Sequence, residues 1–179
     1  MERLLLVGRV VDRINAAVAV VAEYLVLLAV LISAGNAVVR YLFSWSSNAL
    51  LEIQWQMFAG MVLLGAAYTL RMNGHVRVDL LYGNVSHRSR LLIDIFGLLF
   101  FFMPAILFML YLAWPFFLQS WNQGEMSMNA GGLILWPVKS LLPLGFTLLL
   151  LQGLSELVKR FAALQGRLDL DTSYEKPVQ

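Results

Sequence analysis

Four long apolar runs separated by short polar connections dominate the pattern of the chain. They cover residues 14–39, 55–72, 91–118 and 133–158. About 20 apolar residues in a helix cross the hydrocarbon core of a bilayer, and a helix satisfies its backbone hydrogen bonds within the segment. The pattern therefore predicts an all-α integral membrane protein with four transmembrane helices.

The third run is longer than a bilayer requires. About 28 residues at 1.5 Å each give a helix of roughly 42 Å, against a hydrocarbon core of about 30 Å. This helix is expected to tilt, kink or protrude. Proline removes a backbone donor and allows a kink, and the third and fourth runs contain four prolines: Pro104, Pro115, Pro137 and Pro143.

The connection between the first two runs, SWSSNALLEIQWQMF, mixes apolar and polar residues. This mixture predicts an interfacial amphipathic helix with Asn48 as its N-cap. Glu52 in this segment is expected to pair with Arg40 at the other end of the connection, or to bind a partner protein. Tryptophan favours the headgroup level, so four residues are predicted membrane-interface anchors: Trp45, Trp55, Trp121 and Trp136.

Composition supports a membrane location. Of the 179 residues, 60% are hydrophobic and 13% are charged, whereas soluble domains carry about 25% charged residues. No linker or internal repeat divides the chain, so we expect one domain over residues 1–160 and a short polar tail over 161–179. The lack of cysteine excludes disulfides and thiolate chemistry, and a net charge of +2 gives no indication of nucleic-acid binding.

Basic residues are distributed unevenly among the connections. All Lys and Arg residues except Arg40 and Lys139 lie before the first run, between the last residues of the second run and the start of the third, or after the fourth. Cytoplasmic segments of membrane proteins are enriched in Lys and Arg. We therefore predict that both termini are cytoplasmic and that the loops at 41–54 and 119–132 face outside. The second of these loops contains Glu125 and is expected to be flexible.

Glu23 is an unusual residue for the first run. It follows Arg13 by ten residues, about 15 Å of helix, which places it near the bilayer centre. A charge there costs at least about 2.5 to 3.5 kcal/mol. The side chain is therefore expected to face protein or water, to be protonated, or to lie at a shallower depth. A structural hydrogen bond to a neighbouring helix is the favoured interpretation, and a proton or substrate role is the alternative.

The stretch LRMNGHVRVDLL at 70–81 contains the densest group of ionisable residues. His75 and Asp79 are four apart, a spacing that can hold a metal on one helix face. A third ligand is missing, because His87 lies twelve residues from His75 in a polar turn. We expect no metal, haem or other cofactor, and we interpret Arg77 and its neighbours as a cytoplasmic interfacial corner.

Small residues recur along one face of the second run. Gly60 and Ala67 are seven residues apart, as are Ala59 and Ala66, and Gly65 lies beside them. Small residues let helices approach closely in lipid, where packing drives association. Packing within the chain and an interface with a partner are both open interpretations of this stripe.

The order of the motifs resembles the small membrane subunit (DctQ type) of tripartite ATP-independent periplasmic transporters. The resemblance covers roughly residues 10–160. Its most specific part is Gly74-His75-Val76-Arg77-Val78-Asp79, and other parts are Arg40-Tyr41-Leu42-Phe43, Trp45, Glu52, Gly65-Ala66-Ala67, Glu125-Met126-Ser127, Gly131-Gly132, Pro137, Lys139 and Leu151-Gln152-Gly153.

The resemblance implies an accessory or scaffold role in a bacterial inner membrane. In this family a large multispanning subunit carries the substrate and sodium sites, and a periplasmic substrate-binding protein delivers a solute that is usually a carboxylate. The small subunit has no catalytic residues, and no enzyme motif occurs in the chain. Our structural or partner-interface candidates are Glu23, Arg40, Glu52, Gly60, Gly65, Ala67, His75, Arg77, Asp79 and Glu125.

A small proton-coupled exporter that dimerises and uses Glu23 is the alternative function. The strong bias of basic residues disfavours it, because this bias gives the chain one fixed orientation.

Overall fold

The computed structural model describes residues 1–45, 47–74 and 85–170. Four helical segments in it are long and apolar enough to cross a membrane, which confirms the predicted all-α architecture with four spans. The third segment consists of α4, η1 and α5 in one continuous run. The elements are α1 (Glu2–Phe43), α2 (Asn48–Arg71), α4 (His87–Gly97), the π-helical turn η1 (Leu98–Phe102), α5 (Met103–Gln123) and α6 (Trp136–Leu164).

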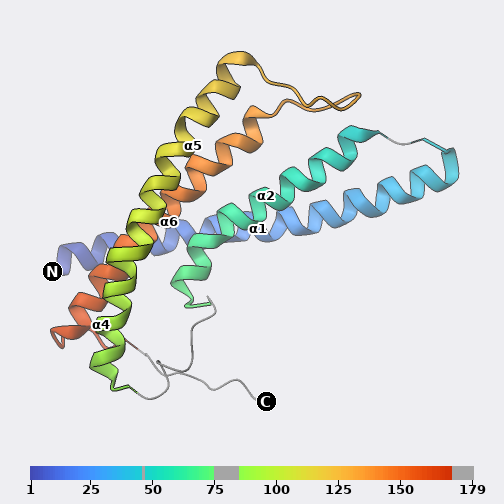
Figure 1. The fold of residues 1–179 in the computed structure, drawn as a ribbon. Helices are drawn as coiled ribbons and strands as arrows, with labels where there is room; N and C mark the ends of the chain where they lie inside the picture. The colour runs from blue at the N-terminus through green and yellow to red at the C-terminus, as the bar shows by residue number, and fades with distance from the viewer. Residues whose placement is uncertain (46, 75–84, 171–179) are drawn as a thin grey trace.

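The helices form two hairpins that diverge from a common region (Figure 1). The hairpin of α1 and α2 extends in one direction and the hairpin of α5 and α6 in another, while α6 contacts α1, α2 and α5. We call the region that contains the N-terminus and the end of α6 the terminal end, and the tips of the hairpins the loop ends. Because α6 contacts all three other spans, it holds the two hairpins together.

Close approach of the helices depends on small residues. A Cβ atom on Gly145 of α6 would lie 2.9 Å from the Leu63 carbonyl oxygen of α2, and one on Gly60 of α2 would lie 2.8 Å from Leu25 Cδ1 of α1. Both distances are shorter than an ordinary van der Waals contact. A buried apolar cluster lies beside these contacts and consists of Ala22, Leu64, Ala67 and Leu148.

The third span contains a π-helical turn just before Pro104. The Met103 N–H donates to the Leu98 carbonyl, five residues back. Proline lacks an N–H, and its ring conflicts with the carbonyl four residues before it, so a wider turn at this position relieves both problems. Pro137 lies in the first turn of α6, whereas Pro115 and Pro143 lie inside helices.

The structure corrects the predicted boundaries near the first connection. α1 has 42 residues, which at 1.5 Å each is about 63 Å, so it extends well beyond the predicted span. The predicted interfacial helix is helical, but it forms the first turns of α2 and is not a separate element. The N-cap is Ser47, whose hydroxyl accepts from the Ala49 N–H, and Asn48 instead donates to the Ala130 carbonyl at 3.2 Å.

Candidate functional site: two polar networks that join the helices

Glu52, in the second turn of α2, binds the connection between α5 and α6. Its carboxylate accepts from the Leu133 N–H at 2.7 Å and from Asn129 Nδ2 at 2.7 Å, and it also accepts from the Ser127 hydroxyl. The side chain is almost fully buried by this connection, with 2% of the residue exposed. These four residues form what we call the Glu52 network, which joins the tips of the two hairpins.

The predicted pairing of Glu52 with Arg40 is therefore wrong. Arg40 is exposed near the end of α1, and the Glu52 oxygens are occupied by donors from a segment about 80 residues later in the chain. Three donors from one connection satisfy the carboxylate oxygens of Glu52, so a cation is not needed to bury it.

The connection between α5 and α6 is also not the flexible loop that the sequence suggested. The Ser127 N–H donates to the Leu133 carbonyl at 2.9 Å, and the Leu135 N–H donates to the Glu125 carbonyl at 2.9 Å. A short antiparallel bridge joins Met126 and Ile134. The connection is a small hairpin with a defined shape.

Glu125 and Lys139 form an ion pair at the base of this hairpin. The hydrogen bond from Lys139 holds the pKa of the Glu125 carboxyl below its usual value, so the carboxylate stays charged at neutral pH. Nearby, the rings of Trp121 and Trp136 meet edge to face with centroids 4.4 Å apart. These contacts hold the end of α5 against the beginning of α6.

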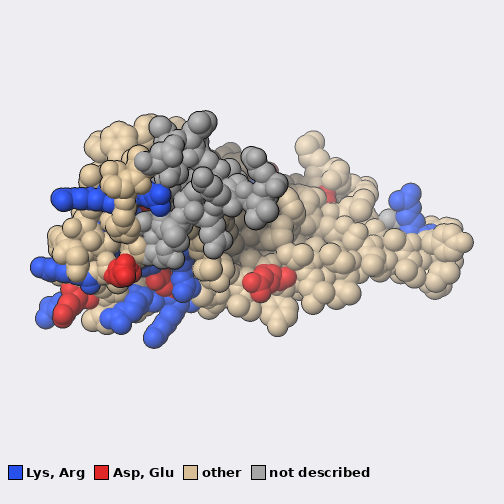
Figure 2. Space-filling model, turned by 90° about the horizontal axis from the view of Figure 1, so that it is seen from below, with Lys and Arg blue, Asp and Glu red and all other residues tan. Residues whose placement is uncertain are grey.

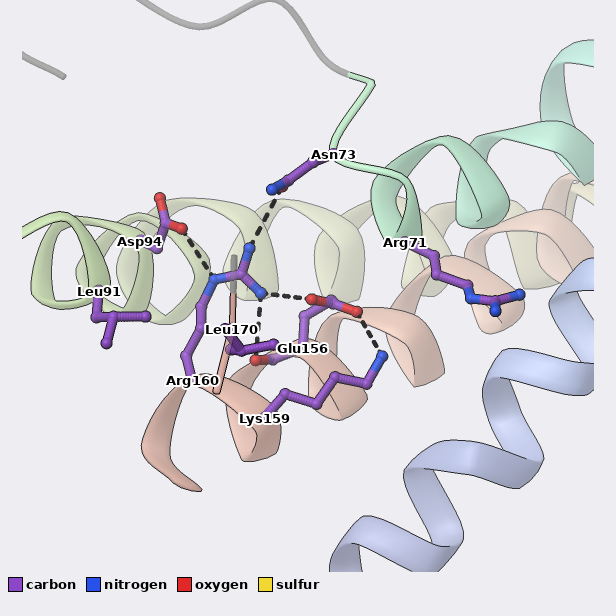
Figure 3. Close-up of a pocket in the computed structure, with 8 residues that line it drawn as sticks. All are labelled: Arg71, Asn73, Leu91, Asp94, Glu156, Lys159, Arg160 and Leu170. Atoms are coloured by element: carbon purple, nitrogen blue, oxygen red, sulfur yellow. Dashed lines mark hydrogen bonds and ion pairs between the residues drawn. The ribbon is translucent and has the colours of Figure 1, made fainter. Parts of the chain in front are cut away.

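A second network lies at the terminal end and centres on Glu156 of α6. Glu156 accepts from Lys159 Nζ at 2.8 Å and from the Arg160 guanidinium, and Arg160 Nε donates to Asp94 of α4 at 3.0 Å. Lys159 also donates to Asp12 of α1 at 2.8 Å. Figure 3 shows Glu156 between Lys159 and Arg160, with Asp94 on the far side of the Arg160 guanidinium. The ion pairs thus connect α1, α4 and α6.

Two buried amides extend this network toward the interior. Asn15 Nδ2 donates to Gln152 Oε1 at 2.7 Å, and Gln152 Nε2 donates to Asp12 at 2.9 Å and to Glu156 at 3.0 Å. Asn15 and Gln152 are 1% and 0% exposed. We call these seven residues the Glu156 network: Asp12, Asn15, Asp94, Gln152, Glu156, Lys159 and Arg160.

The Glu156 network borders a cavity of about 210 Å³ that also meets Arg71 and Asn73. Its acids and bases are paired with one another, and Arg71 points away from the Arg160 guanidinium (Figure 3) and donates to the Asp12 carbonyl at 3.1 Å. Within the described ranges no group of three His, Cys, Asp or Glu side chains can hold a metal. The arrangement binds helices to one another.

Charged side chains gather near this end of the molecule. Figure 2 shows Lys, Arg, Asp and Glu concentrated on one part of the visible face, while most of the remaining described surface is uncharged. This separation is expected for a protein whose charged end lies at the membrane boundary and whose apolar body lies in lipid.

The remaining sequence candidates fall into three groups. Gly60, Gly65 and Ala67 lie in the packing between helices of the same chain: Gly60 faces Leu25, Ala67 is fully buried, and a Cβ on Gly65 would lie 4.0 Å from that of Ala22. The tryptophans Trp45, Trp55 and Trp121 are exposed, and membrane anchoring stays a prediction for them and for Trp136. His75, Arg77 and Asp79 lie outside the described residues.

Glu23 is exposed on α1, so the favoured hydrogen bond to a neighbouring helix of the chain is absent among the described residues.

Sequence reasoning missed most of the Glu156 network. Its signal was present, because Gln152, Glu156 and Arg160 repeat every four residues and so share one face of an apolar helix. A polar stripe inside an apolar run indicates a buried polar contact, but the partners on α1 and α4 are far away in sequence.

The fold and the two networks define a multi-pass helical membrane protein whose buried polar side chains connect its helices. The chain belongs to the DctQ component family of tripartite ATP-independent periplasmic transporters, since the family model matches residues 29–163. This family is a component of those transporters. Comparisons with curated proteins and with solved structures gave no match.

Proposed function

We propose that the chain is the small membrane subunit of a sodium-coupled, binding-protein-dependent secondary transporter for carboxylate solutes. In this proposal it stabilises a large multispanning transport subunit in the bacterial inner membrane and carries out no chemistry. Membership of the family supports the place in a tripartite system. Sodium coupling and the carboxylate solute rest on the resemblance to that family.

The observation that carries the scaffold role is the use of buried polar groups. Glu52 accepts from Asn129 and the Leu133 N–H at 2.7 Å each, and Glu156 accepts from Lys159 at 2.8 Å. Glu52 thus joins α2 to the connection between α5 and α6. Glu156 holds Lys159 and Arg160, which in turn join α6 to Asp12 of α1 and Asp94 of α4. A solute-binding site needs polar groups that can form hydrogen bonds with the solute. Polar groups that already bond to other parts of the same chain are suited to a rigid support.

The orientation belongs to the same proposal. The terminal end with its basic residues is cytoplasmic, and the hairpin held by Glu52 faces the periplasm, where the binding protein operates. In this orientation the corner at His75, Arg77 and Asp79 lies on the cytoplasmic side, where it contacts and supports the large subunit.

Reconstitution tests the proposed function. The chain is co-expressed with a large membrane subunit of a tripartite ATP-independent periplasmic transporter from the same genome, purified by a tag on this chain, and placed in proteoliposomes. We expect the large subunit to co-purify, and uptake of a carboxylate to require both a sodium gradient and the binding protein. Failure of the two membrane proteins to co-purify would contradict the proposal, and export of a cation by this chain alone under a proton gradient would replace it with the exporter.

A further inference from the structure

One exposed face of α1 contains a carboxyl in the middle of an apolar helix. Glu23 is the only acidic or basic residue between Arg13 and Arg40. Counting 1.5 Å per residue, it lies about 15 Å from the first and about 25 Å from the second along the helix. Residues at helical spacings of three, four, seven, eleven and fourteen from it lie on the same side of the helix and are exposed: Val20, Leu27, Val30, Ala34 and Ala37. We call this set together with Glu23 the Glu23 face.

The Glu23 carboxyl has no hydrogen bond or ion pair with the described part of the chain. Burying a charged side chain in lipid costs at least about 2.5 to 3.5 kcal/mol, and such residues in membrane proteins usually face protein or water. Two other glutamates of the helices, Glu52 and Glu156, are bound by several donors each. Glu23 therefore has, in the part of the chain that the structure describes, none of the polar contacts that a carboxyl within an apolar helix needs.

The exposed face of α5 provides a contrast. Between Leu98 and Asn122 the chain has no acidic or basic residue, and its exposed side chains are mostly large. They include Phe108, Tyr111 and Trp114 of α5, and Phe100 and Phe101 of the preceding η1. Such a surface suits lipid directly.

Near the loop end of α1, the side chains of the Glu23 face are small. Ala34 and Ala37 are exposed, and a Cβ added to the neighbouring Gly35 would meet nothing within 4 Å. Small residues on an exposed helix surface let another helix approach closely in lipid. This part of α1 runs beside α2 only, away from α5 and α6 (Figure 1), so the surface is open to a second protein.

We propose that the Glu23 face of α1 is the surface on which the large membrane subunit docks, with a hydrogen-bond donor or cation of that subunit meeting the Glu23 carboxyl. This inference rests on the proposed function and names the surface that it uses. A second copy of this chain fits less well. A two-fold dimer through the same face would bring two Glu23 carboxyls to the same depth, where like charges repel in a low-dielectric medium.

Photo-crosslinking tests the proposal in the intact complex. A benzophenone amino acid replaces Leu27 or Val30 on the Glu23 face, and Phe108 or Leu112 on α5 as matched exposed controls. We expect a crosslinked product with the large subunit from positions 27 and 30 and none from 108 and 112. Products from the α5 positions alone, or crosslinked dimers of this chain from positions 27 and 30, would overturn the inference.

Substitution of Glu23 provides a second, independent readout. We expect E23L to lower the affinity between the two membrane subunits about tenfold, as removal of one hydrogen bond to a charged group does, and E23Q to lose less because an amide still pairs. The melting temperature of the isolated subunit should not fall, because Glu23 has no partner in the described chain. Normal affinity in E23L would contradict the inference.

The two proposals fail in different ways. If the large subunit never co-purifies, the proposed function is wrong. If it co-purifies with full affinity in E23L and crosslinks only from α5, the proposed function stands and the docking surface is elsewhere.

Discussion

At the scale of single residues, the carboxylates of Glu52 and Glu156 are bound by protein donors in place of water. Glu52 receives a backbone N–H, an amide and a hydroxyl from one small hairpin. Glu156 receives a lysine, an arginine and a glutamine from its own helix. Burial of either carboxylate costs free energy unless its hydrogen-bond donors stay in place. The two networks therefore favour one arrangement of the chain.

Replacement of Glu52 should release the hairpin between α5 and α6. In E52A the Leu133 N–H loses its acceptor, and we expect amide exchange at Ser127 and Leu133 to rise at least about tenfold while exchange in the helix centres is unchanged. Hydrogen exchange with mass spectrometry measures this. E23A is the matched control, since it removes a carboxyl that has no partner among the described residues, and equal exchange in the two variants would contradict the assigned role of Glu52.

Loss of Arg160 should destabilise the terminal end. Its side chain is 7% exposed between Asp94 and Glu156, and removing one partner of a buried pair costs roughly 3 to 5 kcal/mol because it leaves the other charge uncompensated. We expect R160A to lower the melting temperature of the purified protein clearly, and the exposed R167A to leave it unchanged. A fluorescence melting curve in detergent decides between these outcomes.

At the scale of elements, α6 is the central helix because its small and polar residues face three different partners. Gly145 approaches α2, Gly153 approaches η1, and the buried Gln152 contacts α1. α1 is the opposite case, since its outer part packs only on α2 and exposes long apolar surface. Packing in lipid depends on close contact, so small residues determine which helix lies in the middle.

A larger residue at Gly145 should separate α2 from α6. A Cβ at this position would lie 2.9 Å from the Leu63 carbonyl oxygen and 3.0 Å from its Cβ. We expect G145A to lower the melting temperature and G145L to prevent folding, because backbone atoms cannot move aside as a flexible side chain can. G97A is the control, since its added Cβ meets nothing within 4 Å. A stability of G145A equal to that of G97A would show that the helices shift without cost.

At the scale of the whole molecule, two hairpins meet through α6 and are tied together at two places far apart. The Glu156 network joins the terminal ends, and the Glu52 network joins the tips. Long apolar surfaces on α1 and α5 remain exposed. Such a body suits a rigid component that lies between lipid and a larger protein.

Orientation in the membrane can be tested directly because the chain has no cysteine. We expect a membrane-impermeant maleimide added to intact spheroplasts to label M128C in the hairpin and to leave R167C unlabelled until the membrane is opened. The reverse pattern would place the basic end outside and contradict the predicted orientation.

The sequence by itself determined that the chain spans a membrane four times and which family it resembles, because length, hydrophobicity and charge bias act locally along the chain. It also located the small residues of α2, though not their partner. Only the tertiary structure decided what Glu52, Asp12 and Gln152 contact, because these pairs join residues about 80 to 140 positions apart. It also decided that Glu23 is exposed. When a helix is apolar on all sides, its sequence does not show which side packs against neighbouring helices, and the arrangement of those helices decides it.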